Sequence, residues 1–434
     1  MALDETRLAI SIDAEDHPAD IAHTLSEVDP GEAWKLLCAL PVDVQAEVFG
    51  YIEPELQEET IEHMTRPQLT ALITEMKADD RADVFNRLSE EQQEILLPAL
   101  AHVERENIRR LAAYEEGSAG AIMTSDYATL KPELTAKEAI AQLRREAPDK
   151  ETIYRTYVLK DDRELIGTVR LTDLILAPPS RKVADLMDDD PVFVTVDDDQ
   201  ESVARTIAKY DILAVPVVDA QHHLVGIVTH DDAIDALEEE ATEDFLRLGA
   251  HGEINESVRT AGIVTLYRAR IVWLILLVFG NLLSGFGIAY FEDTIAAHIA
   301  LIFFLPLLIA SGGNAGAQAA TLMVRALATG DVRSRDWGRM LGREFLVAAA
   351  LGTTMAIAVS GIGIFRGGPE IALVVASSMI IIVLVGSLIG MSLPFILSKF
   401  NMDPATASAP LVTSIADATG VVIYFSIASV VLFG

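Results

Sequence analysis

The sequence predicts a multidomain protein with an α-helical superhelix, a tandem α/β pair, a long connecting helix, and an all-α polytopic membrane domain with five transmembrane helices. A faint 24-residue repeat, a later repeat of about sixty residues and a largely apolar final stretch predict this organisation. At 434 residues the chain is too long for one ordinary domain. The expected boundaries are 1–120 for the helical N-terminal domain, 121–185 and 186–240 for the two α/β modules, 241–262 for an acidic connecting helix, and 263–434 for the membrane domain.

Charge divides the chain into two unequal parts. Residues 263–434 hold nine of the 33 Lys/Arg and eight of the 65 Asp/Glu, a charge of +1, so residues 1–262 carry −33 of the total of −32. Such an acidic surface repels phosphates, which argues against nucleic acid as a partner. It is as consistent with a solubilising surface as with a cation ligand. The single cysteine, Cys38, excludes a disulfide framework and a cysteine-based metal cluster.

The first domain is expected to be a stack of short helices. Repeat units begin at His17, Pro41, Thr65 and Ser89, and each unit reads as two amphipathic helices, such as 67–76 and 80–88. Units of this kind bury their apolar faces against their neighbours and form a superhelix. Residues 1–20 are acidic and have no apolar core, so no signal peptide is expected there.

The second repeat has β-α-β-β-α order. Segments rich in Val, Ile, Thr and Tyr alternate with amphipathic helices, which predicts two α/β modules. The expected strands are 152–159, 164–170, 214–218 and 223–228, and the expected helices are 136–145, 172–176, 200–209 and 231–237. No proline lies between Pro216 and Pro306, so a continuous acidic helix is expected to run from 235 towards 262.

Five apolar segments follow, and each is long enough to cross a bilayer as a helix. Arginines and Lys399 gather in the loops on one side of these segments, which predicts that the N-terminal half lies in the cytosol and that five spans leave the C-terminus outside the plasma (inner) membrane. The expected spans are 271–291, 294–324, 345–365, 371–398 and 404–434.

Asp417 lies near the middle of the last apolar segment. A carboxylate at this depth costs roughly 2.5–3.5 kcal/mol to insert, so it persists only where it meets a partner charge, water or an ion. No Lys or Arg occurs elsewhere in this segment, and Pro410, Thr413, Gly420 and Tyr424 share its helical face. We interpret Asp417 as part of an ion pathway. The alternative is a protonated side chain bonded to a neighbouring helix.

The second span contains Gly312-Gly313-Asn314-Ala315-Gly316-Ala317-Gln318. Gly312 and Gly316 have the spacing of a helix-packing motif, but packing alone does not require Asn314 and Gln318. Irregular or polar backbone at membrane depth is tolerated where it is packed in protein or lines a watery cavity. Asn314 and Gln318 are therefore predicted to lie near a pore.

The available ligands suit a hard divalent cation. Mg²⁺ prefers oxygen ligands and sheds its water reluctantly, and no His or Cys lies near Asp417 to bind a softer metal. Residue spacing does not separate Mg²⁺ from Mn²⁺, Co²⁺ or Ca²⁺. The sequence contains no zinc-protease, phosphate-binding-loop or serine-hydrolase motif, so an enzyme is not expected.

A second cation site is predicted in the acidic part of the chain. Crowded carboxylates repel one another, and a divalent ion between two segments removes that repulsion. The alternative is a solvated, charged helix face. The candidates are Asp231, Asp232, Asp235, Glu239, Glu240, Glu243 and Asp244, with Asp79, Asp80 and Asp83 as an opposing wall.

Taken together, these motifs resemble the MgtE family of magnesium channels over nearly the whole chain. The two modules resemble a CBS pair, with Gly167-Thr-Val-Arg-Leu-Thr-Asp173 and Gly226-Ile-Val-Thr-His-Asp-Asp232 as their ends. The second and fifth spans resemble the family in the glycine-rich segment given above and in Pro410-Leu-Val-Thr-Ser-Ile-Ala-Asp417-Ala-Thr-Gly420.

The resemblance implies a homodimer with a pore on its two-fold axis, where Asp417 of both subunits selects hydrated Mg²⁺. It also implies that cytosolic Mg²⁺ holds the N-terminal domain, the CBS pair and the connecting helix in a closed state. Asp232, Asp235, Glu240, Glu243 and Asp244 match family positions, whereas Asp80 and Asp83 are assigned as their partners by hypothesis. Three alternatives stay open: a Co²⁺ or Mn²⁺ channel, an exporter, and a membrane-anchored nucleotide sensor, because CBS pairs often bind adenine nucleotides.

Overall fold

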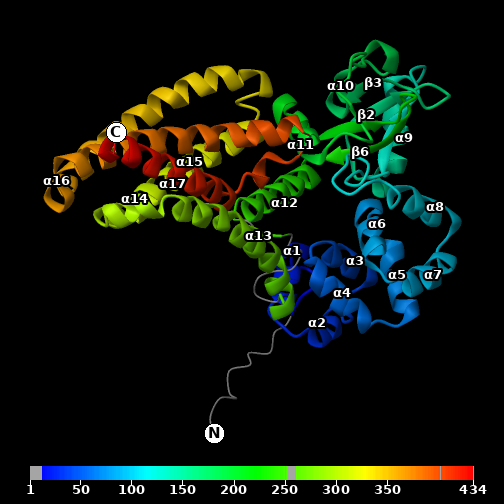
Figure 1. Cartoon of the computed structure of the whole chain (residues 1–434). Coiled ribbons are helices and arrows are strands. Elements are labelled where there is room, and N and C mark those ends of the chain that lie inside the picture. The colour runs from blue at the N-terminus through cyan, green and yellow to red at the C-terminus, as the bar shows by residue number, and fades with distance from the viewer. Residues whose placement is uncertain (1–11, 250, 253–260, 401, 434) are drawn as a thin grey trace, which may run out of the picture. The chain divides into compact units, whose positions relative to one another are not determined.

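The computed structural model describes residues 12–249, 251–252, 261–400 and 402–433 (Figure 1). The chain forms two compact units, Met1–Glu240 and Ala241–Gly434. Each unit has hydrophobic cores of its own, the first around side chains such as Phe49 and Ile73 and the second around side chains such as Phe304 and Tyr424.

The first unit begins with short helices whose ends are set by local sequence. Proline occupies the first position of three of them, where its missing N–H costs nothing, and capping boxes begin two more. Helices two apart in the chain pack against each other, which confirms the predicted helical N-terminal domain. The helices are α1 (Pro18–Leu25), α2 (Pro30–Leu37), α3 (Val42–Gly50), α4 (Pro54–Glu62), α5 (Arg66–Glu75), α6 (Ala78–Arg87), α7 (Glu90–Leu96) and α8 (His102–Leu111).

Two small sheets follow, and they have the same topology. In each sheet the first strand pairs parallel with the second, and the second pairs antiparallel with the third. The predicted strands and helices are confirmed with their ends unchanged or shifted by one residue, except the last helix, which is longer than predicted. The first module contains β1 (Tyr127–Leu130), α9 (Ala136–Glu146), β2 (Thr152–Leu159), β3 (Leu165–Arg170) and α10 (Leu171–Leu176), and the second contains β4 (Val194–Thr195), α11 (Gln200–Tyr210), β5 (Ala214–Val218) and β6 (Leu224–Thr229).

The tips of the two β-hairpins join the modules to each other. The amide of Leu165 donates to the carbonyl of His222, and the amide of Leu224 donates to the carbonyl of Arg163, both at 3.1 Å. Arg163 and His222 have positive φ angles of 71° and 65°, an uncommon conformation for residues with a side chain. The reciprocal bonds relate the two modules by an approximate two-fold axis.

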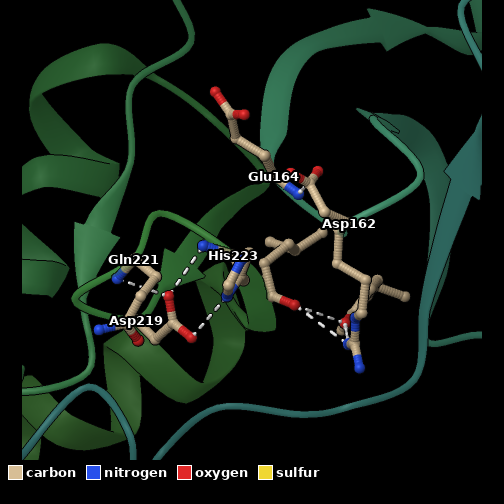
Figure 2. Close-up of polar contacts among 8 residues, drawn as sticks. Asp162, Glu164, Asp219, Gln221 and His223 are labelled. Atoms are coloured by element: carbon tan, nitrogen blue, oxygen red, sulfur yellow. Dashed lines mark hydrogen bonds and ion pairs between the residues drawn. The ribbon is translucent and has the colours of Figure 1, made fainter.

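Aspartate side chains cap both hairpin tips (Figure 2). Asp162 accepts a hydrogen bond from the amide of Glu164 at 3.3 Å. Asp219 accepts from the amides of Gln221 and His223, at 2.9 and 2.8 Å, and lies 3.1 Å from the ring of His223 (Figure 2). These are the local bonds with which aspartate stabilises turns, so the acidic groups in this region have a structural role.

Helix α12 (His230–Leu248) starts directly after β6. It covers only the first part of the connecting helix expected over 241–262. Residues 251–252 and 261–262 are not helical, and residues 250 and 253–260 lie outside the described part of the chain. The prediction of one continuous helix to residue 262 is therefore wrong for the residues that can be compared.

The second unit is built from long apolar helices. Four helices in the described residues are long and apolar enough to cross a membrane, so the predicted count of five separate spanning helices is not confirmed. The expected third and fourth spans lie in one element, in which Gly368 alone is non-helical (φ 83°, ψ −178°). The helices are α13 (Ile263–Tyr290), α14 (Glu292–Ala297), α15 (Ala300–Ala328), α16 (Trp337–Lys399) and α17 (Ala409–Phe433).

The two halves of α16 fold back on each other at Gly368 (Figure 1, yellow to orange). A Cβ atom on Gly363 would lie 2.9 Å from the Cα of Ala372, and one on Gly352 would lie 2.9 Å from the Cα of Ile380. The contacting residues lie farther from Gly368 in both directions along the chain, so the two halves of α16 are antiparallel. Because a bilayer core is about 30 Å thick and a helix rises about 1.5 Å per residue, a straight helix of this length would greatly exceed it.

Glycines bring α15 and the second half of α16 into close contact. A Cβ atom on Gly386 or Gly390 would collide with the carbonyl oxygens of Gly312 and Gly316, respectively. Small residues at regular spacing allow such an approach of two membrane helices. Gly312 and Gly316 therefore have the packing role that their spacing indicates.

Candidate ion sites

Asp417 lies in α17 against the glycine-rich segment of α15. A Cβ atom on Gly313 would lie 3.2 Å from the Asp417 Oδ1 and 3.1 Å from the Cγ2 of Thr413. A side chain at this position would be tightly packed against Asp417 and Thr413, so Gly313 leaves space for the carboxylate beside α15. Gly313 was not singled out as a site residue from the sequence, although it belongs to the segment that was.

The Asp417 carboxylate is half-buried and unpartnered. Within the described part of the chain, no hydrogen bond or ion pair involves it, and the hydroxyl of Thr413 donates instead to the carbonyl of Pro410 at 2.9 Å. A charge at membrane depth with no protein partner requires water or an ion. The alternative of a protonated Asp417 bonded to a neighbouring helix has no such bond to support it in these residues.

The other predicted pore residues take different positions. Asn314 and Gln318 lie one turn apart on the exposed side of α15, whereas Gly420 is buried beside Ile382. The structure therefore brings Asp417, Thr413 and the α15 backbone together, and leaves the two amides on an outward-facing surface.

In the first unit, carboxylates of α6 face the start of α12. Asp79 is the most enclosed, and its Oδ1 is buried with no hydrogen-bond partner. Burial, together with the negative charges of Asp232 and Asp80, raises the pKa of Asp79 well above its ordinary value. A buried carboxylate oxygen facing further carboxylates is the arrangement that an incoming cation relieves.

Asp80 and Asp232 share this electrostatic environment. Burial raises the pKa of Asp80 to about 6, with Lys77 opposing the rise and Glu151 adding to it. Burial also raises the pKa of Asp232 to about 6, although the hydroxyl of Thr229 contacts its carboxylate and opposes the rise. The carboxylate of Asp80 lies over α3, where a Cβ atom on Gly50 would lie 2.6 Å from Oδ2.

Lys77 and Glu151 belong to the same region and were missed in the sequence. Their Nζ and Oε1 atoms lie 2.8 Å apart, and the two residues are 74 positions apart in the chain. Burial lowers the pKa of Lys77, but its hydrogen bond to Glu151 and the charge of Glu151 raise the pKa above its ordinary value overall. No local pattern links a lysine before α6 with a glutamate before β2.

The remaining predicted ligands are more exposed or have other partners. Asp235 and Asp83 are exposed, and Glu240 accepts a hydrogen bond from Gln200 at 3.1 Å. The described residues contain no group of three or more His, Cys, Asp or Glu side chains with metal-binding geometry. The α6 and α12 carboxylates are therefore neighbours, but they do not form a closed coordination shell.

Glu243 is held within the second unit. Arg247 pairs both with Glu243 and with Asp403, and Asp403 also accepts a hydrogen bond from the amide of Ala405 at 2.8 Å. Arg247 thus links α12 to the segment before α17. Asp244, the next predicted ligand, also has a polar partner.

A bundle of long apolar helices with an unpartnered carboxylate in α17, continuous in sequence with an acidic region, defines a polytopic membrane transport protein. Three family models match the chain: the MgtE divalent cation transporter over residues 305–427, the MgtE intracellular N domain over 16–117, and the CBS domain over 119–180 and 183–239.

Similar proteins extend the match to the whole chain. A magnesium transporter MgtE from Thermus thermophilus is 38% identical over 431 residues, which cover 99% of this chain and 96% of that protein. The solved soluble part of a magnesium transporter is 34% identical, with a TM-score of 0.50, and the match covers 52% of this chain and 89% of that one. The cytosolic domain of the Mg²⁺ channel MgtE in complex with ATP is 37% identical, with a TM-score of 0.49, covering 51% and 90%. This chain belongs to the MgtE family of magnesium transporters.

Proposed function

We propose that this chain conducts Mg²⁺ across the membrane along a path that passes the Asp417 carboxylate. The observation that carries the proposal is the unpartnered position of Asp417 beside the Gly313 backbone, inside a bundle of apolar helices. A carboxylate with carbonyl and hydroxyl oxygens nearby suits a cation that keeps most of its water. Membership of a magnesium transporter family supports this choice of ion.

The proposed topology has five crossings. The two antiparallel halves of α16, which meet at Gly368, are each long enough to span a bilayer. Arg339, Arg343 and Lys399 then lie at the same side as the first unit, which places that unit in the cytosol and the C-terminus outside. Lipid surrounds the exposed apolar side chains of the bundle.

The proposed assembly is a homodimer. One chain supplies a single carboxylate, and a second copy facing it would supply the other, so that two Asp417 side chains flank one hydrated ion. Asn314 and Gln318 lie on an outward-facing side of α15, where they are available to line a path shared by two copies. In this arrangement the two Asp417 carboxylates of the dimer together select a divalent cation, although each chain supplies only one of them.

Cytosolic Mg²⁺ is proposed to close the channel by binding between α6 and α12. Asp79, Asp80 and Asp232 repel one another when they are ionised, and a divalent ion between them stabilises the docked arrangement. A ligand that binds one state more tightly shifts the population towards it. Asp83, Asp235, Glu240, Glu243 and Asp244 are kept as further ligands in this proposal.

Adenine nucleotide is a second proposed partner of the CBS pair. A cavity of about 570 Å³ beside α10 contains Arg170 and Arg181, which are suited to phosphate oxygens. Both arginines are paired with aspartates, Arg170 with Asp173 at 2.8 Å. Titration of ATP into the full chain should show binding that Arg170→Gln weakens, and equal binding by both proteins would refute this site.

Ion flux in proteoliposomes tests the proposed function. Full-length protein should carry Mg²⁺ when the cytosolic face is exposed to little Mg²⁺, and carry less when that face is exposed to millimolar Mg²⁺. A series with Co²⁺, Mn²⁺ and Ca²⁺ orders the selectivity, and outward-directed gradients separate an exporter from a channel. Absence of Mg²⁺ flux under every gradient would contradict the proposal.

A further inference from the structure

We propose that the Lys77–Glu151 ion pair is a pivot that keeps the N-terminal helical domain attached to the first α/β module after the divalent ion has left. The inference rests on the proposed gating by Mg²⁺ between α6 and α12. It adds a residue pair that binds no ion and makes a specific mechanical prediction. When the ion leaves, α6 should separate from α12 while its N-terminal end stays close to Glu151.

The charges at the N-terminal end of α6 meet opposite charges in the first module. Lys77 precedes α6 and contacts Glu151 at 2.8 Å, and Glu151 is mostly covered, with 14% of its side chain exposed. One turn later, Arg81 is buried, and the negative charge of Asp126 acts on it. The Arg81 guanidinium also donates to the carbonyl of Met76 at 2.6 Å, which fixes the turn that carries Lys77.

The carboxylates of the same helix meet like charges in the second module. Asp79 faces Asp232, and Asp83 is exposed to the charges of Asp232 and Glu239. Residues 79 and 83 are one turn apart, as residues 77 and 81 are, and positions two apart point to nearly opposite sides of a helix, so the two pairs do not share a face. Ala78 and Ala82 lie between the two pairs around the helix and belong to one apolar cluster with Ala233.

Glu151 also acts on Asp79, Asp80 and Asp232, so the ion pair and the carboxylates are neighbours. When the divalent ion leaves, repulsion returns between α6 and α12, whereas Lys77 and Glu151 keep opposite charges and still attract each other. The domain should then rotate open about the Lys77–Glu151 pair. While Lys77 and Glu151 stay in contact, α6 remains close to α12. The carboxylates of the two helices therefore meet again at a high effective concentration when the ion returns.

Charge reversal distinguishes a pivot from a purely electrostatic effect on ion binding. Lys77→Glu adds negative charge beside the cluster, so electrostatics alone would lower the Mg²⁺ concentration needed for protection. Loss of a pivot would raise it instead. The sign of the shift in Lys77→Glu therefore separates the two explanations, because Glu151→Lys should raise the midpoint under either one. The double variant K77E/E151K restores an attractive pair with unchanged net charge and should recover wild-type behaviour.

The experiment is limited proteolysis of the full-length protein in detergent across a Mg²⁺ titration, following cleavage after α8. We expect Lys77→Glu and Glu151→Lys each to raise the Mg²⁺ midpoint about two- to fivefold, the range expected when a partly exposed ion pair is lost. The double variant should return to within error of wild type. The matched control is Lys131→Glu, which breaks a pair with the same 2.8 Å separation at Asp161 and should leave the midpoint unchanged.

Three outcomes overturn the pivot: a lowered midpoint in Lys77→Glu, no shift in either single variant, or a double variant no better than the singles. Protection from protease at saturating Mg²⁺ shows whether each variant folds. If a charge-reversal variant does not fold, the variants Lys77→Met and Glu151→Met remove the ion pair in its place. Asp232→Asn separates the two proposals. If it shifts the midpoint while the Lys77 and Glu151 variants do not, only the pivot fails. If it also has no effect, the proposed gating site fails with it.

Discussion

The carboxylates that we assign to ion sites have different surroundings in the two units of this protein. In the first unit, carboxylates are numerous, and some have a compensating neighbour, as Glu151 has in Lys77 and Asp232 has in Thr229. In the second unit, Asp417 is the only charged residue of α17, and no hydrogen bond or ion pair in the described residues compensates it. A crowded cluster responds to ion concentration because many weak repulsions change together. An unpartnered carboxylate at membrane depth requires an ion or water beside it at any ion concentration. The comparison therefore separates a region suited to sensing from one suited to conduction.

The largest effect is expected from Asp417→Asn. Removing the only charge in the centre of α17 should reduce Mg²⁺ flux to the background of empty liposomes, while the protein still purifies as a folded species, because no ion pair or hydrogen bond is lost. Glu292→Gln, which removes one negative charge from the segment between α13 and α15, is the control and should conduct normally. Mg²⁺ flux through Asp417→Asn near the wild-type rate would contradict the assignment of conduction to Asp417 in the second unit.

The next effect is on stability and is confined to the second unit. Gly390→Ala places a Cβ atom into the carbonyl oxygen of Gly316, and overpacking of this kind costs roughly 1–3 kcal/mol or more. We expect a lower apparent Tm in detergent and less recovered protein. Gly361→Ala, in the same helix with nothing within 4 Å of the new Cβ, should behave as wild type. Equal behaviour of the two variants would show that α15 and α16 are not in this close contact.

Asp232→Asn should alter gating rather than conduction. It removes one of the carboxylates that face Asp79, so the cluster binds a divalent ion less well. We expect the cytosolic Mg²⁺ concentration that closes the channel to rise several-fold, with maximal flux unchanged. Replacing Asp235, Glu240, Glu243 and Asp244 by amides should produce a channel that fails to close. Unchanged protection from protease by Mg²⁺ in either variant would contradict a sensing role for these residues.

A smaller effect is expected from pH. The pKa values of Asp80 and Asp232 are raised to about 6 in the docked arrangement, so this arrangement binds protons more tightly than separated, solvated carboxylates do. Docking without Mg²⁺ should therefore be most stable at low pH and weaken as the pH rises through about 6. Proteolysis in the absence of Mg²⁺ should be slower at about pH 5 than at about pH 7.5. Slower cleavage at the higher pH would contradict the proposal that ionised Asp80 and Asp232 weaken docking.

Much of the fold was predictable because local patterns determine it. The strand Thr152–Leu159 has the predicted bounds, because β-branched and aromatic residues mark it clearly. Asp417 was found because a carboxylate in an apolar segment is conspicuous. The contact of Lys77 with Glu151 was not predicted, since it joins residues 74 positions apart that share no motif. The third and fourth spans were predicted to be separated by residues 366–370, but the break in α16 is confined to Gly368, where a glycine adopts a positive φ.

The most direct measurement is Mg²⁺ flux through Asp417→Asn, Asp232→Asn and the double variant, in proteoliposomes with millimolar Mg²⁺ at the cytosolic face. We predict more flux through Asp232→Asn than through wild type, and none through Asp417→Asn or the double variant, because opening the gate does not replace the carboxylate in the path. Flux through the double variant equal to that of Asp232→Asn would contradict a conducting role for Asp417.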